Sequence, residues 1–289
     1  MRLASTLPLP AALSSPTGRS YDVAIREGAP DSIGTTRTAL GHEVGPTRAV
    51  LRFPPEVIVG IDNGTEITVQ VGGGYPQSVF DGVLLGPVLG AVLLQREVLA
   101  LHASCVVGTS GAIVIAADAG GGKSVTAGYL HQAGYRLVAD DITAVSFAGD
   151  AALVTPAYPL LKLWPEGVTA LGLDPLTVPV IEPGFGKQGL DVRARFSHEP
   201  VRIEVIVILV RNGGSASTLV QGSEAISALL SASYGRTVLE ASSSLAWHFA
   251  ALAELARHVR IVRVHCGSDL SPGEVAGHII REVSHVGGL

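Results

Sequence analysis

The feature that most restricts the fold of this chain is a run of three glycines followed by a lysine and a serine, Gly120 to Ser124. An apolar strand-like stretch, Ala112 to Ala116, precedes the run, and a helix-like segment, Lys123 to Ala133, follows it. Small residues let successive backbone N–H groups point inward at a helix start, a lysine can reach outer phosphates, and a serine hydroxyl can bind magnesium. The pattern therefore predicts a nucleotide phosphate-binding loop, the P-loop. The alternative is a glycine-rich turn that binds nothing.

The predicted loop departs from the strict motif at its beginning. Ala117 stands where the motif has its first glycine, and Asp118 brings a negative charge close to the expected phosphates. Both residues could reduce nucleotide affinity. The residues expected to surround the phosphates are Asp118, Ala119, Gly120, Gly121, Gly122, Lys123, Ser124 and Val125.

Two adjacent carboxylates, Asp140 and Asp141, follow 17 residues after Lys123. They end a predicted apolar strand, Tyr135 to Ala139, and in an open α/β sheet the carboxyl ends of strands line the ligand crevice. One carboxylate can hold magnesium while the other accepts a proton from an attacking hydroxyl. The alternative is that the aspartates only stop the strand and open a turn.

A single histidine, His102, lies 21 residues before Lys123 in a predicted strand, Val98 to Val107. Ser104 is expected on the same face of that strand, because alternate residues point the same way. A lone histidine in an apolar strand is usually a hydrogen-bonded core residue. Its residue type and position alone therefore do not establish a catalytic role.

The composition narrows the classes of partner. The chain has 289 residues, 47% of them hydrophobic, so a globular fold with one large or two modest domains is expected. The net charge of −5 argues against nucleic acid and anionic lipid as partners. The longest apolar window, Val83 to Leu94, is shorter than the roughly 20 residues that span a bilayer, and Met1 to Ser20 lacks the apolar core of a secretory signal. A cytoplasmic protein is expected, with Cys105 and Cys266 as reduced core thiols.

The chain changes character near residue 97. Before it, Asn63-Gly64 predicts a hairpin turn, and a helix is expected over much of Val79 to Gln95. After it, strands alternate with helices, as in an α/β layer fold. The early strands are predicted at Tyr21–Arg26, Ala49–Phe53, Val57–Ile61 and Glu66–Val71. Later strands are predicted at Ile142–Phe147, Leu153–Pro156, Leu190–Arg193, Ile203–Val210 and Arg260–His265, with helices at Pro165–Leu171, Ser223–Ser231, Ser242–His258 and from Ser271.

Taken together, these motifs resemble the catalytic domain of HPr kinase/phosphorylase, and more closely the shorter bacterial HPr-kinase-like proteins, some of which accompany peptide-modifying gene sets. The resemblance covers roughly residues 84–210. It implies a P-loop-containing, HPr kinase/carboxykinase-like α/β domain over 98–289, beside a smaller β-rich N-terminal region, 1–97, that ends in a helix. The matching segments are Leu101-His102-Ala103-Ser104, Gly122-Lys123-Ser124, Gly134 to Asp141, Tyr158-Pro159, Leu163-Trp164-Pro165 and Lys187.

The resemblance also implies a role for each residue of the site. Lys123 would contact the β- and γ-phosphates of ATP, and Ser124 would bind magnesium. His102 would position or charge-balance the transferred phosphoryl group. Asp140 is expected to be the base for the acceptor hydroxyl and Asp141 to support the metal, although the two roles could be exchanged.

Several positions are less constrained by the resemblance. The Glu-Arg-Gly signature of true HPr kinases is missing from the comparable stretch, Leu161 to Glu166, so neither HPr as a substrate nor phosphorylase activity is implied. Trp164-Pro165 favours a core aromatic residue followed by proline in the first turn of a helix. Lys187 could reach a phosphate or a peptide substrate, and Arg236 could supply a transition-state arginine. For both, a solvated surface charge is the more common outcome.

The spacing of His102, Lys123 and the Asp140-Asp141 pair leads to one prediction of function. The chain is expected to be an ATP-dependent, magnesium-requiring kinase that phosphorylates a hydroxyl, with serine on a protein or peptide favoured. A nucleotide-binding regulator or assembly partner that has lost transfer is one alternative, and a small-molecule kinase is another. The sequence does not identify the acceptor and leaves the oligomeric state open, a homo-oligomer included.

Overall fold

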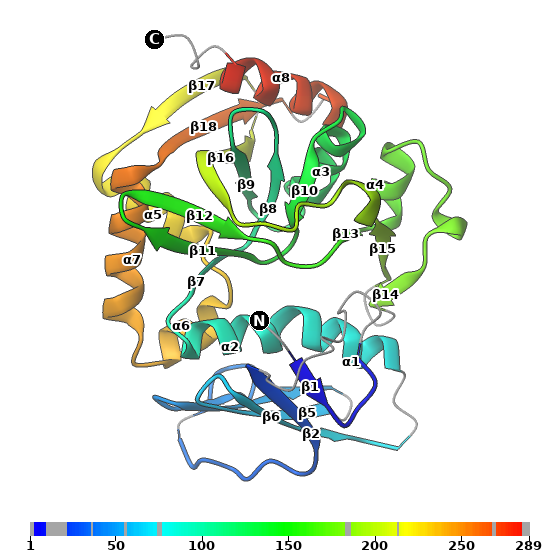
Figure 1. The fold of residues 1–289 in the computed structure, drawn as a ribbon, viewed down its shortest axis with the longest axis vertical. Coiled ribbons are helices and arrows are strands. Elements are labelled where there is room, and N and C mark those ends of the chain that lie inside the picture. Colours follow the sequence, from blue (N-terminus) through cyan, green and yellow to red (C-terminus); the bar gives the residue numbers. More distant parts are fainter. Residues whose placement is uncertain are drawn as a thin grey trace. The chain divides into compact units, whose positions relative to one another are not determined.

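The structure is a computed structural model that describes residues 3–9, 22–35, 37–54, 57–73, 77–182, 186–212, 214–267 and 270–284 (Figure 1). Its residues form two compact units. The first comprises Met1–Val98, Ile181–Phe185 and Gly235–His248, and the second comprises Leu99–Val180, Gly186–Tyr234 and Phe249–Leu289. The sequence placed one boundary near residue 97, and it did not indicate that two later segments belong to the first unit.

The first unit contains a six-stranded sheet with the order β1-β2-β6-β5-β4-β3. The predicted hairpin is confirmed, because β5 and β6 pair antiparallel around Asn63 and Gly64. Their φ angles of 54° and 63° are positive at both central positions of a turn that the Thr65 N–H closes on the Asp62 carbonyl oxygen at 3.0 Å. The strands are β1 (Leu3–Ser5), β2 (Val23–Glu27), β3 (Glu43–Val44), β4 (Arg48–Phe53), β5 (Val57–Asp62) and β6 (Glu66–Val71).

A kinked helical segment packs on this sheet. It consists of α1 (Gln77–Val83), the π-helical turn η1 (Leu84–Val88) and α2 (Leu89–Gln95), and so confirms the helix expected over much of Val79 to Gln95. The kink lies at Gly86, whose φ and ψ of −120° and −108° are not helical, next to Pro87. Apolar residues at helical spacing bury one face in the core of the unit. These residues are Phe80, Leu84, Val88, Ala91 and Val92.

The second unit is built on a mixed sheet with the order β10-β8-β9-β16-β12-β11-β7, to which β18 and β17 add beside β16. β16 runs parallel to β9 and β18, and the other pairs are antiparallel. The strands are β7 (Leu99–Leu101), β8 (Ala103–Val107), β9 (Ala112–Ala117), β10 (Arg136–Ala139), β11 (Thr143–Ala148), β12 (Ala151–Thr155), β16 (Val201–Arg211), β17 (Ser215–Val220) and β18 (Arg260–Cys266).

Helices and a strand pair complete the second unit. β13 (Leu160–Leu163) pairs antiparallel with β15 (Lys187–Asp191), and α3 and α8 pack in the same core as the central strands. No helix in the described ranges is long and apolar enough to cross a membrane. The remaining elements of the chain are α3 (Lys123–Gln132), α4 (Pro165–Ala170), η2 (Pro175–Thr177), β14 (Val180–Glu182), η3 (Arg193–Arg195), α5 (Gly222–Ser231), α6 (Arg236–Ala241), α7 (Leu245–His258) and α8 (Pro272–Ser284).

Several elements differ from the sequence-based expectation. The predicted strand Val98 to Val107 is interrupted at His102, because β7 pairs with β11 whereas β8 pairs with β9 and β10. The helix expected from Ser242 begins at Leu245, and a separate helix, α6, precedes it. β13 and β17 were missed, the first because Lys162 breaks its apolar run and the second because its sequence is mostly small and polar.

The site is positioned by three adjacent strands of the second unit. Ala103 in β8 pairs with Ala116 in β9, and Cys105 in β8 pairs with Ala139 in β10. Because β8 runs antiparallel to both neighbours, its beginning lies beside the ends of β9 and β10. The glycine-rich loop after β9 and the two aspartates after β10 therefore come together with His102, which directly precedes β8.

Candidate functional site

The glycine-rich loop makes a tight turn between β9 and α3. Gly120 and Gly122 have φ angles of 75° and 92°, in the left-handed region where only glycine avoids a steric cost. A Cβ on Gly121 would lie 2.7 Å from the Cβ of Ala117. Two of the three glycines are therefore required by backbone conformation and the third by space.

Lys123 begins α3 and folds back over the loop. Its Nζ donates hydrogen bonds to the carbonyl oxygens of Ala117 at 2.9 Å and Asp118 at 3.2 Å. Burial lowers the pKa of Lys123, and the charges of Asp140 and Asp141 offset this only in part. A polyanion bound at the start of α3 would stabilise the ammonium ion, so the loop fits a phosphate ligand.

Asp140 is fully buried, with 0% of its surface exposed. Its Oδ1 accepts hydrogen bonds from the Ser104 hydroxyl at 2.6 Å and the Ser124 hydroxyl at 2.9 Å. Its Oδ2 accepts one from the backbone N–H of Lys162 at 2.7 Å. Burial raises the pKa of Asp140, and the three hydrogen bonds oppose that effect. This single carboxyl group joins the end of β10 to β8, α3 and β13.

We expect Ser104→Ala to lower the free energy of unfolding by about 1–3 kcal/mol, because it removes a donor from a fully buried carboxyl group. Thr143→Val is the matched control, since the Thr143 hydroxyl is equally buried but donates to the neutral carbonyl of Ala103. We expect Thr143→Val to lower the free energy of unfolding by less than Ser104→Ala does. Urea unfolding of both variants measures the difference. Equal stabilities for Ser104→Ala and the unmodified protein would contradict the prediction.

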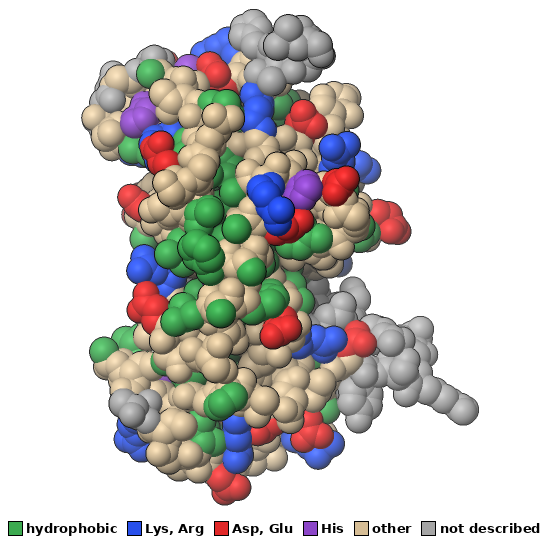
Figure 2. All heavy atoms as spheres, turned by 90° about the vertical axis from the view of Figure 1, so that its left-hand side faces the viewer, with side chains coloured by type: hydrophobic (Ala, Val, Ile, Leu, Met, Phe, Trp, Pro, Cys, Tyr) green, Lys and Arg blue, Asp and Glu red, His purple; other side chains and the backbone are tan. Residues whose placement is uncertain are grey.

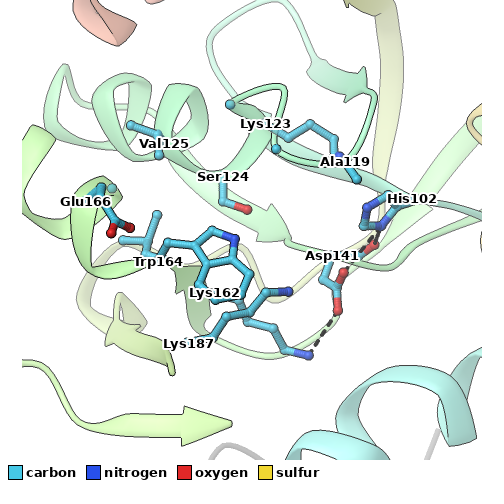
Figure 3. A pocket seen from close by; sticks show the side chains of 14 residues that line it. His102, Ala119, Lys123, Ser124, Val125, Asp141, Lys162, Trp164, Glu166 and Lys187 are labelled. Atoms are coloured by element: carbon cyan, nitrogen blue, oxygen red, sulfur yellow. Dashed lines mark hydrogen bonds and ion pairs between the residues drawn. The ribbon is translucent and has the colours of Figure 1, made fainter. Parts of the chain in front are cut away.

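Asp141 turns the other way and lines the cavity described below (Figure 3). Its Oδ2 lies 3.0 Å from Nζ of Lys162, and its Oδ1 lies 3.3 Å from Nδ1 of His102. Burial by itself raises the pKa of Asp141. The hydrogen bond from His102 and the charges of Lys162, His102 and Lys187 outweigh burial and hold that pKa well below its usual range. Asp141 is therefore ionised at neutral pH.

His102 is not a core residue, since 36% of its side chain is exposed. Its Nδ1 is 3.1 Å from the carbonyl oxygen of Asp141 as well as close to the carboxylate, so Nδ1 must carry the hydrogen. The expectation that His102 and Ser104 share the face of one strand is wrong, because the chain bends between β7 and β8. Both side chains nevertheless reach the aspartate pair, His102 at Asp141 and Ser104 at Asp140.

Lys162 belongs to the site and was not singled out from the sequence. Only 1% of its side chain is exposed, and its Nζ lies 5.8 Å from the ring centroid of Tyr158 as well as beside Asp141. Burial raises the pKa of Tyr158, which keeps its phenol protonated. The available signal was a lysine between Leu161 and Leu163, because a charge inside a short apolar strand is rarely buried without a partner.

His102, Asp141 and Lys162 line one cavity of about 380 Å³ together with residues of the glycine-rich loop. Its volume falls in the range of about 300–1,000 Å³ that is typical of ligand pockets. Three lysines, Lys123, Lys162 and Lys187, face two carboxylates, Asp141 and Glu166, and this balance favours an anionic ligand. The lining residues are His102, Ala119, Gly120, Gly122, Lys123, Ser124, Val125, Asp141, Lys162, Leu163, Trp164, Glu166, Gly167 and Lys187.

One prediction outside the loop needs correction, and two candidate contacts can be placed. Trp164 was expected in the core, but 44% of it is exposed and it lines the cavity, while Pro165 does begin α4. Nζ of Lys187 lies 5.6 Å from the centroid of the Trp164 ring, in a cation–π contact. Arg236 belongs to the first unit, where it pairs with the exposed Glu240, and it is not among the described residues that line the cavity.

The residues present suit magnesium only together with a nucleotide. In the described part of the chain, no cluster of three or more His, Cys, Asp or Glu side chains could hold a metal ion. The Ser124 hydroxyl lines the cavity and supplies an oxygen atom of the kind that magnesium prefers, while the buried Asp140 carboxylate accepts its hydrogen at 2.9 Å. Magnesium commonly takes its other ligands from substrate phosphates and water, so this hydroxyl fits an ion that arrives with a nucleotide.

Comparisons with known proteins add little to this description. No family model and no curated protein sequence matches the chain. Among solved structures, the chain is similar to the HPr(Ser) kinase/phosphatase from Coxiella burnetii, with 11% identity and a TM-score of 0.36 over 65% of this chain and 99% of that one. A likeness at this level carries no argument about function, which has to be inferred from the residues of the site.

Proposed function

We propose that the protein is an ATP-dependent, magnesium-requiring kinase that transfers the γ-phosphoryl group of ATP to a hydroxyl, with serine on a protein or peptide as the favoured acceptor. One observation carries the proposal: a glycine-rich loop, its lysine and an ionised, cavity-lining aspartate surround a single cavity. Phosphoryl transfer depends mainly on positioning and charge neutralisation, which these groups can provide.

The loop and Lys123 would hold the phosphates. Backbone N–H groups of a phosphate-binding loop cradle the α- and β-phosphates, and its lysine reaches the β- and γ-phosphates. Lys123 would exchange the carbonyls of Ala117 and Asp118 for phosphate oxygens. The Asp118 side chain is exposed and is not among the described residues lining the cavity, so its charge does not oppose the ligand from within the site.

Ser124 would bind magnesium, and the buried Asp140 would orient the Ser124 hydroxyl by accepting its hydrogen. Bound magnesium neutralises charge on the β- and γ-phosphates. Asp140 is fully buried and accepts hydrogen bonds on both oxygens, which leaves it no access to an acceptor hydroxyl. We therefore exchange the roles that the resemblance suggested, so that Asp140 supports the metal and Asp141 receives the acceptor.

Asp141 would accept a hydrogen bond from the acceptor hydroxyl and orient it for in-line attack. Its low pKa makes it a weak base, which suits a loose transition state in which the proton leaves as the new P–O bond forms. Lys162 keeps Asp141 ionised. Because Nδ1 of His102 donates to Asp141, Nε2 is the nitrogen left to face the transferred phosphoryl group, and it would donate to a phosphoryl oxygen when both ring nitrogens carry hydrogen. Lys187 would add a further positive charge.

A direct test is transfer from γ-labelled ATP with magnesium to candidate acceptors, including the proteins and peptides encoded beside this gene. We expect one of these acceptors to carry the labelled phosphate on a serine, as a phosphate ester that is stable in acid and cleaved by alkali. Label on a metabolite instead would replace the protein or peptide acceptor with a small molecule. Tight ATP binding with no transfer to any acceptor would contradict a kinase and favour the nucleotide-binding regulator.

A further inference from the structure

We infer that Trp164 and Glu166 form the nucleoside end of the cavity, where the indole stacks on the base and the carboxylate accepts hydrogen bonds from the ribose hydroxyls. The inference deepens the proposed function and rests on it, because it assumes that the glycine-rich loop holds phosphates. It assigns two residues that phosphoryl transfer itself does not use.

The cavity has two chemically different ends (Figure 3). His102 and Asp141 lie on one side of Ser124, while Trp164 and Glu166 lie on the other. The first end carries the groups that can orient an acceptor. The second end offers an aromatic face and a carboxylate, which are groups that recognise a nucleoside rather than a phosphate.

The polarity of the loop determines which end the nucleoside occupies. The lysine of a phosphate-binding loop reaches the β- and γ-phosphates, while the α-phosphate and nucleoside continue away from it. Here Nζ of Lys123 lies against the beginning of the loop, and Val125 follows Ser124 in the first turn of α3. Val125 lies on the same side of the view as Glu166, so the nucleoside would leave the loop toward α4.

The local fold holds Trp164 at this position. Trp164 is the extended residue before α4, with φ −72° and ψ 157°, and Pro165 fixes the first turn of that helix. A Cβ on Gly167 would lie 2.8 Å from the Val125 side chain, so α4 packs directly against the first turn of α3. The tryptophan is kept partly exposed although large aromatic residues are usually well buried.

Stacking on an indole discriminates weakly between bases, because every base presents a π face. The subsite should therefore accept ATP and GTP with similar affinity. The ribose is expected to contribute separately through Glu166, in the way that an acidic residue binds ribose hydroxyls in dinucleotide-binding folds. Lys187 contacts the same indole and would bring its charge close to the phosphates.

Calorimetric titration of the full chain with magnesium and either ATP or inorganic tripolyphosphate separates the base from the phosphates. We expect Trp164→Ala to weaken ATP binding by roughly tenfold and Trp164→Phe to restore most of that loss. Tripolyphosphate binding should weaken much less than ATP binding in either variant, because it loses only what the indole contributes by holding Lys187. Trp247→Phe, at the second of the two tryptophans and outside the described cavity lining, is the control and should bind ATP normally.

Each alternative outcome has a distinct meaning. Unchanged ATP affinity in Trp164→Ala would overturn the stacking, and an equal loss for tripolyphosphate would show that Trp164 only supports the fold of the site. Glu166→Gln should weaken the binding of ATP but not the binding of 2′,3′-dideoxy-ATP, which lacks both ribose hydroxyls. An equal loss of affinity for the two nucleotides would overturn the ribose contact. If the unmodified protein binds neither ATP nor tripolyphosphate, the proposed function fails together with this inference. If it binds tripolyphosphate with the same affinity as ATP, only this inference is overturned.

Discussion

Asp141→Asn is expected to slow phosphoryl transfer by about 100- to 10,000-fold while ATP still binds, because it removes the carboxylate that orients the acceptor hydroxyl and finally accepts its proton. Asparagine suits the test, since Asp141 has a φ of 69° and asparagine tolerates this left-handed conformation. Its amide oxygen can still accept a hydrogen bond from Lys162. Single-turnover transfer from labelled ATP, with calorimetry for binding, measures the two effects separately.

Asp191→Asn is the matched control for this experiment. Asp191 is an exposed aspartate on β15 that pairs with Arg193, and it does not line the described cavity. Its substitution should leave transfer unchanged. Transfer by Asp141→Asn at the rate of the unmodified protein would refute the role assigned to Asp141. The exchange of roles would be unsupported if Asp140→Asn slowed transfer as much as Asp141→Asn and its transfer still depended on magnesium.

The second large effect is expected at Lys162. Lys162→Met should lower the free energy of unfolding by about 3–5 kcal/mol at pH 7, because it leaves the buried charge of Asp141 without its closest cation. Combining Lys162→Met with Asp141→Asn should cost much less than the sum of the single changes, since the uncompensated charge is then absent. Lys162→Arg keeps the charge and serves as the control. Urea unfolding of the unmodified protein, the two single variants, the double variant and the Lys162→Arg control provides the measurement.

The pH dependence tests the same ion pair independently. The pKa of Asp141 is lower in the folded protein than the value of about 3.9 expected for an unfolded aspartate. Its contribution to stability is therefore fully present above that value and is lost as the pH falls through the folded pKa. The difference in stability between the unmodified protein and Lys162→Met should be largest near neutral pH and shrink below about pH 4. A difference that does not change with pH would rule out the ion pair as its source.

Features with local signals could be predicted from the sequence. The glycines before Lys123 indicated a turn between a strand and a helix, and Asn63-Gly64 indicated a hairpin, because both depend on backbone conformations that few residues adopt. The position of the aspartate pair followed from the end of an apolar strand. The bend at His102 could not be predicted in this way, since no glycine or proline marks it. It arises because β7 and β8 pair with different neighbours.

The features that were missed depend on contacts between distant segments. Lys162 reaches Asp141 only because β13 brings it to the end of β10, and nothing in its own stretch indicates that partner. Trp164 looked like a core residue because its neighbours are apolar, and its exposure follows from the packing of α4 on α3. The different positions of Asp140 and Asp141 were equally inaccessible, because adjacent residues point in different directions and burial depends on what surrounds each one.

The buried carboxyl group of Asp140 has a further consequence for how the site responds to ligands. It joins Ser104, Ser124 and the backbone of Lys162, which the sequence separates by up to 58 residues. Because these hydrogen bonds come from the chain's own groups, they hold β8, α3 and β13 in register around the loop. The binding energy of a nucleotide therefore need not be diverted into ordering these groups.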